Sequence, residues 1–99
     1  MNGQVNLWVN GVPINVDYFV SEFIDHTVDG MLRSLSGVGE IGELDLAIEQ
    51  DSQVTIKLNN AQVPVNLFVN RIMHNTILGM ISSLRDVSGM NTVRITIKH

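Results

Sequence analysis

The chain contains no cysteine, only two prolines and only five aromatic residues among its 99 residues. Without cysteine it can form no disulfide, no thiolate zinc site and no cysteine nucleophile, so nothing in it indicates an oxidising compartment. Its apolar runs are far shorter than the roughly 20 residues that span a bilayer, and its first residues carry no basic leader. We therefore expect a cytoplasmic protein that does not insert into a membrane.

Apolar residues make up 44% of the sequence and charged residues only 16%. A chain near 100 residues buries roughly 65% of its unfolded surface, so with few aromatic residues the core must come from Leu, Ile and Val. The length predicts a single domain over residues 1–99.

The two halves of the chain repeat each other at an offset of 49 residues, which superimposes 4–50 on 53–99. Ten apolar or threonine positions of 16–35 recur at this offset with spacings of three and four, which are typical of one buried helical stripe. We therefore expect helices over 17–36 and 66–85. The paired positions are Val16, Phe19, Val20, Phe23, Ile24, Thr27, Val28, Met31, Leu32 and Leu35, and then Val65, Phe68, Val69, Ile72, Met73, Thr76, Ile77, Met80, Ile81 and Leu84. The candidate helix caps are Asn15 or Asp17, Asn66, and Gly37 at the end of the first helix.

Around each helix the apolar residues alternate with period two, which is typical of half-buried strands. Asn10-Gly11 predicts a type I′ hairpin over 4–16, whereas the second half suggests a longer turn over 59–62. Pro13 and Pro64 lack an N–H, which places the two returning strands at sheet edges or keeps them short.

Only three residues separate the strands expected at 43–49 and 53–59, so these strands should form a hairpin and join the halves in one sheet. The sequence therefore predicts an α+β fold of duplicated ββαβ units. These units form one mostly antiparallel six-stranded sheet with two helices packed on one face, related by a pseudo-two-fold axis.

Charge separates the halves, because residues 1–50 hold eight acids and one base whereas 51–99 hold two acids and five bases. Three acids of the first half become bases at the 49-residue offset: Glu22, Asp45 and Glu49 match Arg71, Arg94 and Lys98. Antiparallel strands about the axis would pair Asp45 with Lys98 and Glu49 with Arg94, each pair contributing about 0.2 to 1 kcal/mol. Contacts between molecules and drift without consequence are the alternatives.

A line of small residues follows each helix: Thr27, Gly30 and Ser34 match Thr76, Gly79 and Ser83. A glycine inside a helix costs about 1 kcal/mol relative to alanine, so its recurrence favours close packing of the two helices. A slot for a small ligand between helices and sheet at these six residues is the alternative.

Residues 37–42 read Gly-Val-Gly-Glu-Ile-Gly, which matches the glycine spacing of a dinucleotide-binding loop. The segment follows a helix and leads into a strand, which is the reverse of the order that points helix amides at a phosphate. We interpret it as a flexible turn anchored by Val38 and Ile41, and we expect no cofactor.

One face of the first helix collects Glu22, Asp25, His26 and Asp29. Their spacing suits a divalent cation or a proton-transfer pair, but an exposed cluster without a concave pocket binds metal weakly. The second half replaces them with Arg71, His74, Asn75 and Leu78. We interpret the four as a solvated face, leave cation binding open, and interpret His74 and His99 as isolated surface residues.

Two functional classes are disfavoured. No nucleophile elbow or Ser-His-Asp arrangement is present, so no catalytic residue is assigned and a non-enzymatic role is preferred. The acidic balance, and the absence of a basic stripe with interleaved aromatics, argue against nucleic-acid binding.

Apolar or charged residues outside the buried pattern favour a protein partner. We predict a binding or assembly module that contacts another protein or a second copy, with the outer face of 66–84 as the leading surface. The predicted interaction residues are Trp8, Tyr18, Leu67, Arg71, His74 and Leu78. A small-molecule binder or enzyme with a slot beside Gly30 and Gly79 is the alternative.

Overall fold

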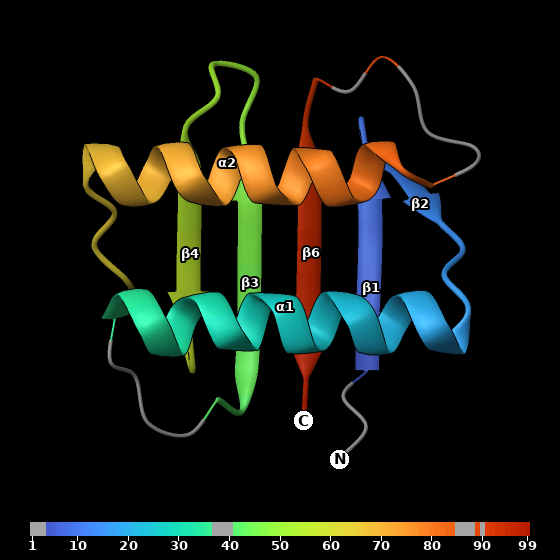
Figure 1. Ribbon diagram of the computed structural model, residues 1–99, viewed down its shortest axis with the longest axis horizontal. Coiled ribbons are helices and arrows are strands. Elements are labelled where there is room, and N and C mark those ends of the chain that lie inside the picture. Colours follow the sequence, from blue (N-terminus) through green and yellow to red (C-terminus); the bar gives the residue numbers. More distant parts are fainter. Residues whose placement is uncertain (1–3, 37–40, 85–88, 90) are drawn as a thin grey trace.

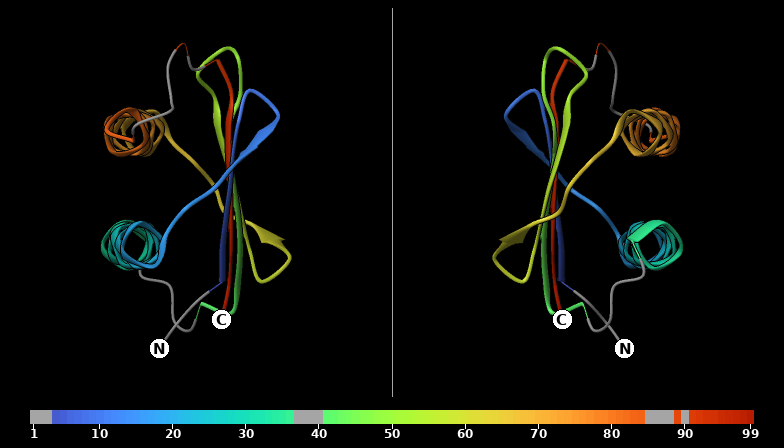
Figure 2. Two further views of the ribbon diagram at one scale, coloured as in Figure 1. Left: turned by 90° about the vertical axis from the view of Figure 1, so that its right-hand side faces the viewer. Right: turned by 90° about the vertical axis from the view of Figure 1, so that its left-hand side faces the viewer.

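The computed structural model describes residues 4–36, 41–84, 89 and 91–99. Two helices lie side by side, run in opposite directions (Figure 1) and cover the same face of one antiparallel sheet (Figure 2). The predicted α+β class, the six strands and the shared helix face are therefore confirmed. The elements in chain order are β1 (Gln4–Val9), β2 (Val12–Ile14), α1 (Tyr18–Ser36), β3 (Glu43–Ile48), β4 (Val54–Leu58), β5 (Ala61–Gln62), α2 (Leu67–Ser82) and β6 (Val93–Lys98).

The strand order is β2-β1-β6-β3-β4-β5. The predicted hairpin between β3 and β4 is present, and β3 and β6 pair at the centre of the sheet. The short strands β2 and β5 are the edges, with Pro13 inside β2 and Pro64 just beyond β5. The missing N–H of each proline therefore interrupts no central ladder, as the sequence predicts. Within the described residues, neither helix combines the length and hydropathy needed to cross a membrane.

Asparagine forms both edge hairpins. Asn10 and Gly11 have φ of 53° and 78°, which confirms the predicted two-residue turn. The prediction of a longer second turn is wrong, because Leu58 pairs with Ala61 and only Asn59 and Asn60 lie between them, with φ of 50° and 68°. Asparagine tolerates positive φ better than most residues, so Asn-Asn closes the hairpin without glycine.

The first asparagine of each hairpin turn, Asn10 or Asn59, also anchors a loop, and the two loops lie at opposite ends of the central strands. Asn10 Oδ1 accepts hydrogen bonds from the backbone N–H groups of Asn91 and Thr92, at 2.7 and 3.0 Å. Asn59 Oδ1 accepts from Gly42 and Glu43, at 2.9 and 2.8 Å.

Both helices begin at predicted caps. Asp17 Oδ1 accepts from the backbone N–H of Val20 and Asn66 Oδ1 from that of Val69, each at 2.8 Å. Each side chain satisfies an N–H that lacks a helical partner. Gly37, the predicted end of the first helix, lies outside the described residues.

The core lies between the sheet and the helices. One face of every long strand is buried, and each helix adds three fully buried residues to it, one turn apart. These are Ile24, Val28 and Leu32 of α1 and Met73, Ile77 and Ile81 of α2. The aliphatic core that the composition predicts is therefore present.

The predicted helix stripe is too wide. Phe19, Phe23, Phe68 and Ile72 belong to the predicted buried positions, yet they are exposed, at 74%, 52%, 63% and 37%. A sheet covers only one side of a helix, so the residues nearest the sheet are buried, and those on the far edge of the stripe face outward.

The register between the central strands also differs from expectation. Glu43 is opposite Lys98, and Ala47 is opposite Arg94, so the predicted pairs of Asp45 with Lys98 and Glu49 with Arg94 are wrong. The observed register is displaced by two residues. A displacement of two keeps every side chain on the same face of the sheet, so hydropathy alone does not distinguish the two registers.

Candidate functional site

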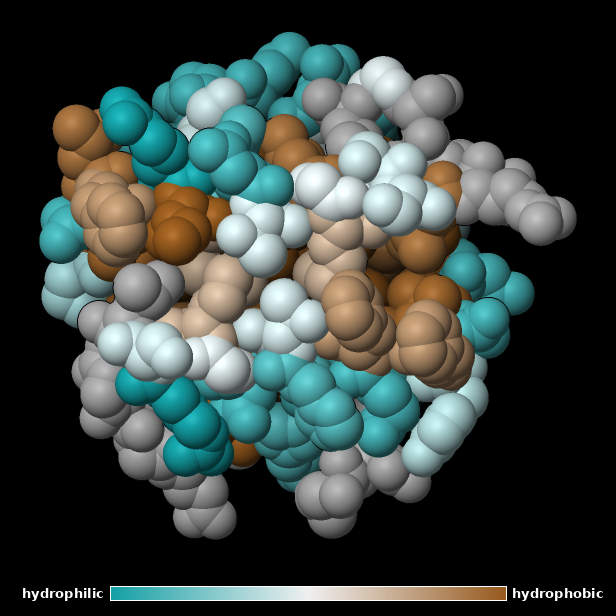
Figure 3. Space-filling model, in the orientation of Figure 1, coloured by the Kyte–Doolittle hydropathy of each residue, from teal (hydrophilic) through white to brown (hydrophobic). Residues whose placement is uncertain are grey.

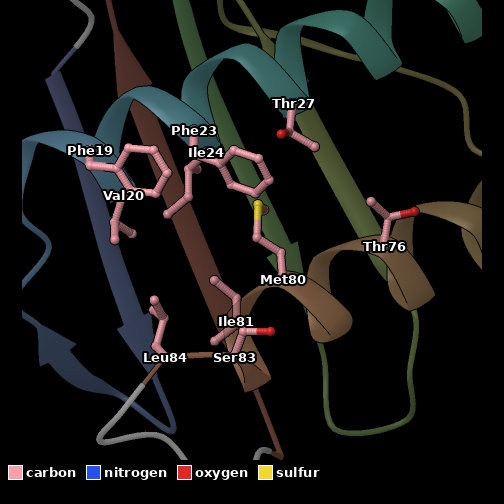
Figure 4. Close-up of a pocket in the computed structure, with 10 residues that line it drawn as sticks. All are labelled: Phe19, Val20, Phe23, Ile24, Thr27, Thr76, Met80, Ile81, Ser83 and Leu84. Carbon is pink, nitrogen blue, oxygen red and sulfur yellow. The ribbon is translucent and has the colours of Figure 1, made fainter.

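An apolar groove separates the outer sides of α1 and α2 and has a volume of about 590 Å³. In Figure 4 the ring of Phe23 extends from α1 toward Met80 of α2. The lining residues come from α1, from α2 and from the two residues just beyond α2, and none of them is charged: Phe19, Val20, Phe23, Ile24, Thr27, Thr76, Met80, Ile81, Ser83 and Leu84. The groove therefore offers apolar contact and three hydroxyl groups, but no acid, base or metal ligand.

Four large apolar side chains of the two helices are exposed, and we call Phe19, Phe23, Phe68 and Ile72 the aromatic crest. Phe19 and Phe23 also line the groove. The rings of Phe19 and Phe23 stack with their centroids 6.3 Å apart. Figure 3 shows hydrophobic side chains across the helix face, bordered above and below by hydrophilic ones. Aromatic side chains with most of their area in water are characteristic of interaction surfaces.

The small residues do not mark a close approach of the helices. A Cβ at Gly30 or Gly79 would meet no heavy atom within 4 Å, so the prediction of close helix packing at these glycines is wrong. The groove lies between the helices and is lined by three of the six residues of the predicted slot. Thr27, Thr76 and Ser83 line it, whereas Gly30, Gly79 and Ser34 do not.

The predicted interaction residues are dispersed. Tyr18, Leu67 and Arg71 are exposed on the helices. Leu78 is half-buried and packs against the core, so its predicted outward position is wrong. His74 is half-buried with Nδ1 3.2 Å from Asn75 Oδ1, so it is not isolated.

Trp8 lies on the outer face of the sheet, as predicted, but it is half-buried there. The guanidinium of Arg94 lies 5.4 Å from the centre of its ring. Arg94 also forms two hydrogen bonds to the carboxylate of Asp45, at 2.8 and 3.1 Å, and Lys98 lies 3.5 Å from Glu43. The hydrogen bonds and charge of Asp45 raise the pKa of Arg94. The polar groups of this face therefore partner one another.

The acidic helix face does not converge on a cation. Asp29 binds Arg33 at 2.8 Å, and Glu22 lies 3.8 Å from His26. Asp25 is only 2% exposed, so its interpretation as part of a solvated face is wrong. Among the residues that the structure describes, no group of three acidic, histidine or cysteine side chains is placed to hold a metal ion.

Asp25 instead partners His99, which the sequence suggested was an isolated surface residue. His99 Nε2 lies 2.9 and 3.0 Å from the two carboxylate oxygens, and Nδ1 lies 2.7 Å from the carbonyl oxygen of Ile41. The carbonyl oxygen of Ile41 only accepts hydrogen bonds, so Nδ1 donates to it, and Nε2 donates to Asp25 when the imidazole is protonated. The bond to Ile41 raises the pKa of His99; burial opposes this, and Asp25 adds to it.

The glycine-rich segment is described only in part. Ile41 is buried, in agreement with its predicted role as an anchor, and the backbone N–H of Gly42 donates to Asn59. The residues 37–40, including Val38, lie outside the described residues.

The sequence predicts a candidate surface on one helix, but the residues of the aromatic crest come from both helices. The width of the apolar stripe in the sequence was the signal that could have indicated this surface. Ten apolar or threonine positions in 20 residues exceed what one sheet can cover, so part of the stripe must face something else.

Comparisons with protein-family models, with curated proteins and with solved structures found no match.

Proposed function

We propose that this chain is a non-enzymatic assembly module that self-associates through the outer face of α1 and α2. The observation that carries the proposal is the aromatic crest, which leaves three phenylalanines more than half exposed and an isoleucine more than a third exposed, although the core is filled by aliphatic residues. The uncharged lining of the groove supports a binding role rather than a catalytic one.

The size of the face supports a stable contact. Six large apolar side chains are exposed on the helices: Tyr18, Phe19, Phe23, Leu67, Phe68 and Ile72. At roughly 200 Å² for each large side chain, their exposed parts amount to on the order of 700 Å² per copy. A typical interface buries about 800 Å² on each partner, so the helix face approaches that size before its polar border is counted.

We also infer that 4–50 and 53–99 are duplicated ββαβ units related by a pseudo-two-fold axis. In support, Asn10 and Asn59 accept from N–H groups that are themselves 49 residues apart, and Leu46 pairs with its own counterpart, Ile95. Such an axis gives each helix half of the same apolar face, and a face of this kind suits the isologous contact of a two-fold dimer.

The test replaces one residue of the crest on each helix, Phe19→Asp together with Phe68→Asp. Both residues lie in the first turn of a helix, where neither helix has an acid, so the new carboxylates interact favourably with the helix dipole. The variant should therefore stay folded and lose association. At about 2 kcal/mol per lost anchor, the dissociation constant should rise more than about 100-fold.

Light scattering over a range of concentrations measures the outcome. Val12→Asp is the matched control, because Val12 is an exposed apolar residue on β2, away from the helix face. We expect wild type and the control to dimerise alike. A wild type that stays at 11.0 kDa at high concentration, or a dimer that survives the double substitution, would contradict the proposal.

A small apolar ligand is the second candidate, because a groove of about 590 Å³ lies within the range of ligand sites. The lining would select a neutral molecule that uses at most the hydroxyls of Thr27, Thr76 and Ser83. Native mass spectrometry separates the two candidates. A small molecule retained on a monomer would favour the ligand, whereas a dimer free of added mass favours self-association.

A further inference from the structure

We propose that two copies pack helix layer against helix layer, with α1 of one copy facing α2 of the other, so that the crest of each copy packs against the exposed glycines of its partner. This inference rests on the proposed self-association and adds the arrangement of the two copies.

The relief of the helix face is the first argument. In α1, Phe19 and Phe23 lie in the N-terminal half, and Gly30 lies in the C-terminal half. In α2, Phe68 and Ile72 are likewise followed by Gly79. The helices run in opposite directions, so each bulky half lies across the groove from the small half of the other helix (Figure 1). Figure 4 shows this at one end, where Phe23 approaches Met80, the neighbour of Gly79.

A surface with its bulky residues in one pair of diagonal corners and its small residues in the other pair is complementary to a second copy of itself. Rotating a second copy by 180° about an axis along the groove places its Phe23 above Gly79 and its Ile72 above Gly30. Both glycines are exposed, and a Cβ at either position would meet no atom within 4 Å. The space is therefore free to receive a side chain from another copy, which explains glycines that their own chain does not require.

The positions of the bulky and small residues also permit a second arrangement, in which the two-fold axis crosses the groove and α1 packs against α1 of the other copy. Charge distinguishes the two. Apart from the buried Asp25, helix α1 carries the acids Glu22 and Asp29 against a single base, Arg33, which pairs with Asp29. Helix α2 carries Arg71 and no acid. Packing α1 on its own copy would bring two acidic helices together, while packing it on α2 places it against the helix with a positive charge.

Two exposed residues near the middle of the helices report the arrangement directly. His26 follows Phe23 by three residues, and Asn75 follows Ile72 by three, so both lie on the crest side of their helices. Because the midpoints stay close whatever the crossing angle, His26 of one copy lies beside Asn75 of the other in the proposed arrangement. In the alternative arrangement, His26 lies beside His26.

The experiment uses His26→Cys and Asn75→Cys as separate proteins, oxidised alone and as an equimolar mixture. The chain has no other cysteine, so every disulfide joins the introduced residues. A disulfide requires Cα atoms within about 7 Å. We expect the mixture to form the mixed disulfide, which is identified by its mass. Each protein oxidised alone should remain unlinked.

Light scattering on the same samples before oxidation separates failure of the arrangement from failure of the proposed function. Dimers that link His26→Cys to itself would overturn the arrangement and leave self-association standing. Dimers that link in neither combination would overturn it as well. Proteins that are monomeric throughout, together with a monomeric wild type, would overturn both.

Discussion

The outer face of the sheet and the outer face of the helices differ in how their side chains are partnered. On the outer face of the sheet, polar and charged residues alternate with the buried ones and partner one another, as Arg94 does with Asp45 and with the ring of Trp8. On the outer face of the helices, aromatic side chains project with no such partners among the described residues apart from the stacking of Phe19 on Phe23.

This difference indicates which face water covers and which face another molecule covers. A polar face whose charges are paired is stable in water, and its single tryptophan is partly shielded by an arginine. The free energy falls when a binding partner removes the exposed phenylalanines of the crest from water. This difference is the basis of the proposal that a second copy covers the helices and that the sheet faces solvent.

The sharpest way to break this comparison lies within one helix. Ile77 faces the sheet and is fully buried, whereas Phe68, earlier in the same helix, is exposed. In dilute monomeric protein, Ile77→Ala should lower the free energy of unfolding by about 2 to 5 kcal/mol, and Phe68→Ala by less than about 0.5 kcal/mol. Urea unfolding followed by circular dichroism measures both. Equal losses would mean that the crest is part of the core.

A second prediction concerns the buried acid on the side of α1 away from the groove. Asp25→Ala removes the carboxylate that accepts from His99 and should cost about 1.5 to 3 kcal/mol. Glu22→Ala is the matched control, because its contact with His26 is longer and His26 is mostly exposed, and it should cost less than about 0.5 kcal/mol. Indistinguishable urea midpoints for the two variants would show that Asp25 acts as a solvated residue.

The charge of His99 predicts a dependence on pH. Its pKa is raised above the ordinary 6.5 in the folded protein, so the folded state binds the proton more tightly than the unfolded chain. The resulting stabilisation is fully present below 6.5 and is lost as pH rises through the folded pKa. The free energy of unfolding should therefore fall as the pH rises above 6.5 and through the folded pKa, and His99→Gln should flatten this fall. An unchanged slope in the variant would assign the dependence to another group.

Glycine offers a prediction of opposite sign. Gly30→Ala and Gly79→Ala should each raise the stability of the monomer by about 0.5 to 1 kcal/mol, because alanine is the better helix former and its methyl meets open space. Thermal unfolding of dilute protein measures the gain. A loss of stability would revive the close helix packing that the sequence suggested.

The smallest effect is expected on the sheet. Asp45→Asn weakens the bonds from Arg94, but both side chains are more than a third exposed, so the cost should stay below about 1 kcal/mol. Association should not change at all, since this face remains in water. A weaker dimer in this variant would move the interface from the helices to the sheet.

Most of the fold could be predicted from the sequence because each element carries a local signal. The alternation of strands, the caps at Asp17 and Asn66, the Asn10-Gly11 turn and the edge prolines act over a few residues. The β3–β6 register is different, because a displacement of two residues preserves the inward and outward pattern. Periodicity therefore identified the faces of the strands but not the partners across them.

The candidate site was harder to predict for a related reason. Periodicity shows that Phe19 and Phe23 lie on the same side of the helix as Val20 and Ile24, but not how far the sheet reaches around that side. Asp25 was misplaced because its partner, His99, is 74 residues away. Contacts between distant segments leave no trace in local spacing, so only the assembled structure shows that Asp25 is buried, unlike the other two acids of this helix face.

The most direct test of the account is a dilution series followed by amide and side-chain NMR signals of the wild-type protein. The chain has one tryptophan, so its single indole N–H signal reports the outer face of the sheet, while Phe19, Phe23, Phe68 and Ile72 report the helix face. We expect the signals of the helix face to shift with concentration and the Trp8 indole to stay fixed. Shifts centred on Trp8 and Arg94, or no shift at any concentration, would contradict self-association through the helices.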